Sequence, residues 1–214
     1  MSDRFDMREY ELLLEAAQEG GYAFREFGGE APAPADLLLR HDVDLSLDAA
    51  LAMARLEAEM GVRATYFLMT RSVFYNLASA EGERALAELR ELGHAVAHHA
   101  VHPYIDLDDR FDPVLAWHNP DPEYMREPVG AAVNVMDAPW FDPVHYRSDS
   151  NQHWRSGCPH AALAAGELPW LQLLTHPEIW VYPGATMRET MLAFLDADRA
   201  VRLEHLRNDR IDLS

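Results

Sequence analysis

The chain has 214 residues, of which 49% are hydrophobic and 25% are charged, so it is long and apolar enough for one domain with a single core. Its 36 acidic and 18 basic residues give a formal charge of −18, which disfavours nucleic acid as a partner. All basic residues are arginines and Cys158 is the only cysteine, which excludes lysine Schiff bases, P-loop lysines, internal disulfides and cysteine-rich zinc sites.

The N-terminal segment has the pattern of a helix. Apolar residues recur at helical spacing over residues 7–19, and Gly20 and Gly21 follow as a stop signal. The segment contains no apolar run long enough for a signal peptide or a membrane span. Together with the single cysteine, this predicts a cytoplasmic protein that does not bind membranes.

Strand and helix patterns then alternate along the chain. We expect strands over residues 37–39, 62–69 and 94–98, and helices over residues 47–60 and 83–92. Prolines interrupt the second half, where strands over residues 114–117 and 171–175 and a helix over residues 187–197 are predicted. This alternation is typical of a parallel α/β sheet, and we expect residues 1–214 to form one domain.

Polar residues follow three of the predicted strands. Asp42 and Asp44 come after the first strand, His98 and His102 after the third, and His176 after the strand at residues 171–175. Parallel α/β folds gather their active-site residues at the carboxyl ends of the strands. We therefore expect these five side chains to share one site.

Two histidines four residues apart can bind one metal ion, and Asp44 completes a set of two histidines and one carboxylate. Such a set suits zinc, iron, cobalt, nickel or manganese. The histidines next to the proposed site residues, His41 and His99, are expected to point to the opposite face of their strands and to serve packing.

Four short motifs resemble the HDVD-containing branch of the polysaccharide deacetylase, or NodB-homology, family of carbohydrate esterases. They are RHDVD at residues 40–44, HHAVHP at residues 98–103, YRSDS at residues 146–150 and LLTHP at residues 173–177. The resemblance implies an α/β fold, a distorted and incomplete (β/α) barrel with parallel strands. Because residues 104–116 leave little room for a helix, we expect this barrel to lack one outer helix.

The resemblance also implies roles for individual residues. Asp42 would be the general base and His176 the general acid, while Asp44, His98 and His102 would bind one divalent transition metal, with zinc as the first choice. Three further residues are predicted to orient the base or the acid or to contact substrate: Arg147, Asp149 and His118.

The expected activity is the metal-dependent removal of an acyl group from an amide, with an N-acylated amino sugar as substrate. Two alternatives remain open on the sequence: a non-catalytic carbohydrate-binding relative of the deacetylases, and a non-haem iron oxygenase, which uses the same ligand types. The expected partner is a carbohydrate or other small molecule. Self-association into a homo-oligomer is left open.

Overall fold

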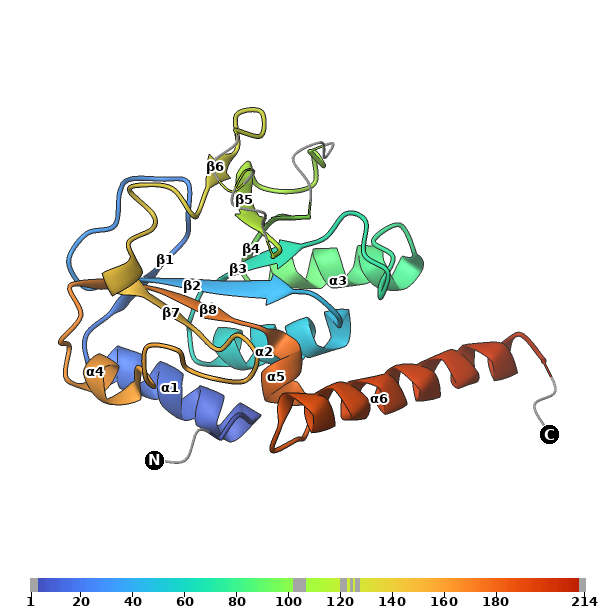
Figure 1. Ribbon diagram of the computed structural model, residues 1–214. Coiled ribbons are helices and arrows are strands. Elements are labelled where there is room, and N and C mark those ends of the chain that lie inside the picture. The colour runs from blue at the N-terminus through green and yellow to red at the C-terminus, as the bar shows by residue number, and fades with distance from the viewer. Residues whose placement is uncertain (1–3, 102–106, 120–122, 124, 126–127, 212–214) are drawn as a thin grey trace.

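The computed structural model describes residues 4–101, 107–119, 123, 125 and 128–211 (Figure 1). The strands are β1 (Ala23–Arg25), β2 (Asp36–Val43), β3 (Thr65–Leu68), β4 (Ala95–Ala100), β5 (Val114–Trp117), β6 (Val133–Asn134), β7 (Tyr146–Ser148) and β8 (Trp170–Thr175). The helices are α1 (Met7–Glu19), α2 (Leu47–Glu59), α3 (Ala80–Glu91), α4 (His160–Ala164), α5 (Pro177–Val181) and α6 (Met187–Asn208), and η1 (Pro143–His145) is a short 3-10 helix.

The strands form one curled parallel sheet. Their order is β6-β5-β4-β3-β2-β8-β7, and β1 pairs with the first residues of β2. Each of these pairs is parallel. In the described residues, β6 and β7 at the two ends of this order do not pair with each other, so the barrel stays open. The predicted fold, a distorted and incomplete (β/α) barrel, is confirmed.

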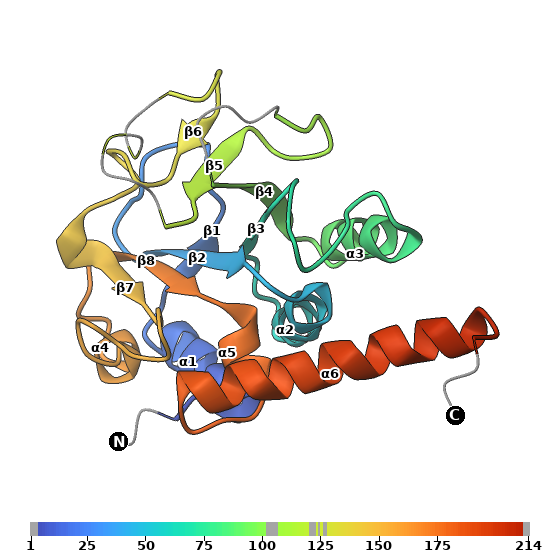
Figure 2. The same ribbon diagram turned by 45° about the vertical axis from the view of Figure 1, so that its right-hand side comes forward.

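The outer layer of helices is interrupted beside β4 and β5. Helix α2 connects β2 to β3, and α3 connects β3 to β4, but the described residues 107–113 before β5 form no helix. Figure 2 shows β5 and β6 flanked by loops, whereas α1, α2 and α3 cover the neighbouring part of the sheet. In the part of the chain that the structure describes, this agrees with the expected loss of an outer helix.

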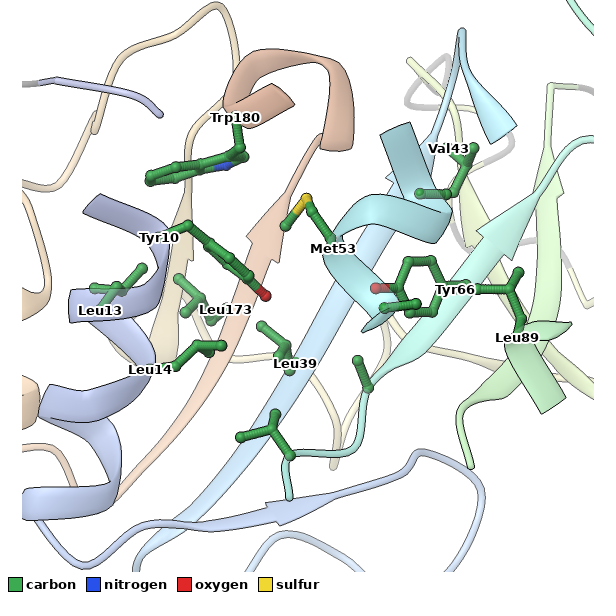
Figure 3. Close-up of a cluster of buried hydrophobic side chains, with 14 of the residues drawn as sticks. Tyr10, Leu13, Leu14, Leu39, Val43, Met53, Tyr66, Leu89, Leu173 and Trp180 are labelled. Carbon is green, nitrogen blue, oxygen red and sulfur yellow. The ribbon is translucent and has the colours of Figure 1, made fainter. Parts of the chain in front are cut away.

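The main core lies between the outer face of the sheet and its helices. Leu14 of α1, Leu39 of β2, Met53 of α2 and Leu173 of β8 are buried together there (Figure 3). Burial of each large apolar side chain contributes roughly 1.5–3 kcal/mol. This cluster therefore supplies most of the hydrophobic stabilisation of the fold.

A smaller apolar cluster fills the inner face of the curled sheet. It includes Leu38 of β2, Phe67 of β3, Ala97 of β4 and Trp140. Because β2 is buried on both faces along its whole length, its apolar residues are consecutive rather than alternating. This explains why the run at residues 37–39 predicts a buried parallel strand.

The C-terminal helix is longer than the sequence pattern predicts. Thr186 caps its start, and α6 continues beyond residue 197 to Asn208 because no proline or glycine interrupts it. An ion pair of 2.6 Å between Asp198 and Arg202 links successive turns. Figures 1 and 2 show that α6 starts beside α5 and that its C-terminal end projects beyond the rest of the fold, while Phe194 and Arg202 still contact Phe74 of the body. No helix in the described residues is both long enough and apolar enough to cross a membrane.

Candidate metal centre and active site

The inner face of the sheet carries the predicted base and the carboxylate of the predicted metal site. In the strand register, Asp42 lies beside Phe67, which lies beside Ala97. Neighbouring side chains across a sheet point to the same face, and successive residues of a strand alternate between faces. Asp44 and His99, each two residues further along, therefore reach the same side.

His98 occupies the opposite face. It lies beside Leu68 in the register, and Leu68 lies beside Val43 of the outer core. Its side chain is buried and packs against Phe111 with a ring-centroid distance of 4.9 Å, and burial lowers its pKa. The structure thus does not bring His98 to Asp44, and the ligand set predicted from the sequence has to be corrected at this position.

Asp44, His99 and His118 form a cluster that could hold a metal ion. Oδ1 of Asp44 lies 3.0 Å from Nε2 of His99 and 3.1 Å from Nδ1 of His118. The three ligand atoms all lie within 4.8 Å of one another. Burial opposes ionisation of Asp44, but hydrogen bonds with His118 and His99 hold its pKa well below the usual range. The same hydrogen bond to Asp44 raises the pKa of His118.

This donor set fits a divalent transition metal. Nδ1 of His99 lies 3.3 Å from the carbonyl oxygen of Ala116, to which it can donate a hydrogen bond. That tautomer directs the lone pair of Nε2 at the carboxylate of Asp44, and two such acceptors need a proton or a cation between them. The ligands of a tetrahedral zinc ion are roughly 3.3 Å apart, close to the separations observed here.

The other predicted ligand, His102, lies outside the described residues. His118, predicted only to orient or contact substrate, contacts Asp44 directly instead. His118 follows β5, and its backbone N–H donates to the carbonyl oxygen of Ala100 in β4 at 2.8 Å. The sequence signal for it is a histidine at the end of a predicted strand, the same signal that marks His176.

Asp42 is held in a buried ion pair with an arginine of its own strand. Nε and Nη2 of Arg40 donate to the two carboxylate oxygens of Asp42, each at 2.7 Å. The guanidinium lies 5.4 Å from the ring centre of Phe67, and its Nη1 donates to Gln172 at 3.3 Å. Burial opposes ionisation of Asp42, but Arg40 and then His99 lower its pKa, so it stays a carboxylate.

His176 is held by the buried carboxylate of Asp149, which directly follows β7. Oδ1 of Asp149 lies 2.6 Å from Nδ1 of His176, and Oδ2 accepts from the backbone N–H of His176 at 2.9 Å and from Trp180 at 2.7 Å. Burial alone would lower the pKa of His176, but Asp149 outweighs it and raises the pKa to about 10. Asp149 thus lies where its predicted orienting role requires.

Arg147, also predicted to orient the site, contacts its own segment. Its Nη1 donates to the carbonyl oxygens of Val144 at 3.0 Å and Tyr146 at 2.8 Å. The arginine that contacts the predicted base is Arg40. Residues two apart on a strand share a face, so the sequence contained a signal for the pairing of Arg40 with Asp42.

A buried carboxyl group, Glu178, lies in the first turn of α5. It is 2% exposed, and its Oε2 has no hydrogen-bond partner among the described residues. Burial raises its pKa to about 8, with His176 opposing this rise and Asp44 adding to it. At neutral pH the side chain is therefore mostly protonated.

Replacing Glu178 by glutamine is expected to make stability less sensitive to pH. A carboxyl whose pKa rises on folding from 4.5 to about 8 stabilises the native state below pH 4.5 and loses this contribution as the pH increases through 8. Each unit of pKa shift corresponds to about 1.4 kcal/mol. The free energy of unfolding of Glu178→Gln, relative to that of the wild type, should therefore increase by a few kcal/mol from pH 5 to pH 9. Urea unfolding at both pH values measures this, and a difference that does not change with pH would contradict it.

The outer face directly behind the predicted base and acid holds a hydrogen bond between their strand neighbours. His41 precedes Asp42, Thr175 precedes His176, and the two are paired in the register of β2 and β8. Nδ1 of His41 lies 2.6 Å from Oγ1 of Thr175, and both side chains are buried. This contact joins the two strands at the residues next to the catalytic candidates. His41 thus points away from the site, as the sequence predicts, whereas His99, for which the same was expected, faces Asp44.

A fully buried carboxylate completes this network. Oε1 of Glu57 lies 2.8 Å from Nε2 of His41 and accepts from the hydroxyl of Tyr10 at 2.5 Å, while Oε2 accepts from the hydroxyl of Tyr66 at 2.8 Å. Burial opposes its ionisation, but His41 lowers its pKa. Glu57 therefore remains charged in the core because three polar groups surround it.

Glu57→Gln is expected to reduce the free energy of unfolding by about 2–4 kcal/mol, because His41 and the two tyrosines lose a charged acceptor that water cannot replace. Urea denaturation measures the change. Glu59→Gln on the same helix is the matched control, since Glu59 is exposed and should change stability by less than about 0.5 kcal/mol. Equal effects of the two substitutions would contradict the role assigned to Glu57.

No protein-family model, curated protein or solved structure matched this chain.

Proposed function

We propose that this protein is a metal-dependent amide hydrolase of the polysaccharide deacetylase type, which removes the acyl group from an N-acylated amino sugar. One observation supports this most: a proton acceptor and a proton donor lie on adjacent strands beside a cluster of two histidines and one carboxylate. Asp42 on β2 and His176 after β8 are each electrostatically coupled to groups of this site, Asp42 to His99 and His176, and His176 to Asp44.

Asp44, His99 and His118 would hold the metal ion. A bound divalent metal would polarise the acyl carbonyl group and lower the pKa of a water molecule. Zinc is the first choice, and iron, cobalt, nickel and manganese accept the same ligands. The hydrogen bond from His99 to the backbone of Ala116 would keep its Nε2 directed into the site.

The protein's own residues would move the protons. Asp42 accepts one proton from water as the water oxygen bonds to the acyl carbon, and Arg40 keeps the carboxylate in place through two hydrogen bonds. The carbon–nitrogen bond then breaks while His176 transfers its proton to the nitrogen. One water is consumed, and an amine and a carboxylic acid are released.

The protonation state of His176 favours an amide as the substrate. An amine leaves readily only when its nitrogen is protonated, so the step needs a group that carries a proton at neutral pH. With a pKa raised to about 10 beside Asp149, His176 meets this need. The choice of an amino sugar comes from the resemblance of the four motifs to the deacetylases.

The test is a metal analysis followed by a substrate screen. Purified protein would be loaded separately with zinc, iron, cobalt, nickel or manganese and incubated with N-acetylated amino sugars as monomers and short oligomers, with release of free amine as the readout. Turnover without oxygen supports the proposal. Turnover that needs oxygen and a keto acid would favour the oxygenase, and binding of the sugar without any turnover would favour the non-catalytic relative.

His160→Ala is the matched control for the metal analysis. It removes a histidine at the start of α4, outside the Asp44, His99 and His118 cluster. We expect it to bind the same amount of metal as the wild type. A wild-type protein that binds none of the five metals would overturn the proposed chemistry.

A further inference from the structure

Helix α6 carries an apolar stripe on the side that faces away from the body. Leu192, Leu195, Leu203 and Leu206 recur at spacings that place them on one face of a helix. Leu192, Leu195 and Leu206 are exposed by 44%, 49% and 37%. Phe194, on the opposite face, is buried and packs against the body. Leu203 is half-buried. These four leucines are called here the outer stripe.

The charge of α6 favours a second copy of this chain as the cover. The whole chain carries a formal charge of −18, whereas α6 contains four arginines and four acidic residues and is neutral. Two strongly acidic bodies repel each other, so contact is least unfavourable through a neutral element that projects from each body. Figures 1 and 2 show that α6 is such an element.

The order of residues along the outer stripe is symmetric about Arg199. Leu195 and Leu203 lie four residues to either side of it, and Leu192 and Leu206 lie seven. A two-fold axis brings identical surfaces together in reverse order. From this we infer that two copies of the chain pair through antiparallel α6 helices, with the axis at Arg199. Leu192 then faces Leu206 of the partner subunit, and Leu195 faces Leu203 of the partner subunit.

The helix dipoles favour this direction. Antiparallel pairing puts the positive end of one α6 beside the negative end of the other, whereas parallel pairing would align the two dipoles unfavourably. Arg202 keeps its contacts within its own subunit, where it pairs with Asp198 at 2.6 Å and donates to the carbonyl oxygen of Phe74. The two Arg199 side chains near the axis are long enough to extend outward into water.

The helix pair sets the strength of the dimer. A helix of 22 residues is about 33 Å long, and two such helices form a contact at the small end of the range for specific interfaces. We expect a dissociation constant in the micromolar range, at about 1 to 100 μM. This pairing does not depend on the proposed hydrolase activity.

Sedimentation analysis over about 1 to 500 μM, a range that brackets the expected constant, tests the pairing. The wild type should convert from monomer to dimer, and Leu195→Glu and Leu206→Glu should each stay monomeric with an unchanged circular dichroism spectrum. Val144→Glu is the matched control, because Val144 is 66% exposed but lies on η1. A monomeric wild type at the highest concentration, or dimers in both leucine variants, would overturn the inference.

Disulfide trapping tests the direction of the pair in a Cys158→Ser background, which removes the exposed native thiol. The double variant Leu192→Cys/Leu206→Cys should form a covalent dimer on oxidation, because antiparallel pairing brings these two positions together. The single variant Leu192→Cys should not form a covalent dimer, because antiparallel pairing keeps the two copies of this position apart. Efficient trapping of the single variant would show parallel pairing and overturn the inferred geometry.

Discussion

His99→Ala is expected to weaken binding of the divalent metal by more than about 100-fold, beyond the 10- to 100-fold cost of losing a residue that only supports a ligand. The reason is the register of the sheet, which directs His99 at Asp44 and turns its neighbour His98 toward Phe111. Competition with a chromogenic chelator measures the affinity, and Asp44→Ala should show a loss of the same order.

The neighbouring residue is the matched control for this prediction. His98→Ala removes a buried histidine from the same strand, so it should lower stability through the cavity it leaves. The folded variant should still bind metal with the affinity of the wild type. The reverse pattern, with metal lost in His98→Ala and kept in His99→Ala, would show that the deacetylase-like motif binds through His98 and that the register of β4 differs from the one described here.

Asp42→Asn is expected to lower kcat for deacetylation by about 10²- to 10⁴-fold, the range for loss of a general base, with metal content unchanged. Asparagine has nearly the same shape but cannot accept the proton from water. Steady-state kinetics on the substrate found in the screen, beside elemental analysis of the variant, gives both values.

Asp36→Asn separates this catalytic effect from a general effect on the strand. Asp36 is also buried and lies at the opposite end of β2, where it accepts from the backbone N–H of Ala33. We expect nearly normal kcat in this variant. Because Asp42→Asn also leaves the buried Arg40 without a counter-charge, its stability should fall by about 3–5 kcal/mol, so kinetics should be measured at a temperature where circular dichroism shows it folded. Normal kcat in Asp42→Asn would remove it as the base.

The sequence predicts the regular part of the fold well because that part depends on local patterns. The helix expected over residues 7–19 has these bounds in α1, and the strand expected over residues 114–117 has these bounds in β5. The short strands β1 and β7 have no comparable signal. They are three residues long and only partly buried, and they are defined by pairing with distant strands rather than by their own composition.

The candidate site shows a second limit of the sequence. Strand alternation states that His98 and His99 point to opposite faces, but it cannot state which of them faces Asp44. That choice depends on how β4 is aligned with β3 and how β3 is aligned with β2. A local motif contains no information about this alignment, so HHAVHP alone assigns the wrong histidine to the inner face.

The contact between His41 and Thr175 has a consequence for the folding kinetics of the chain. These residues are 134 positions apart, so the adjacent strands that carry the proposed base and acid meet only after a long loop closes. Such non-local contacts form late, because the entropy cost of closing the loop comes before the stabilisation it brings. We expect the proposed hydrolase activity to return only in the slowest phase of refolding, after helix content has recovered. Activity that returned together with the first rise in helix content would contradict this order.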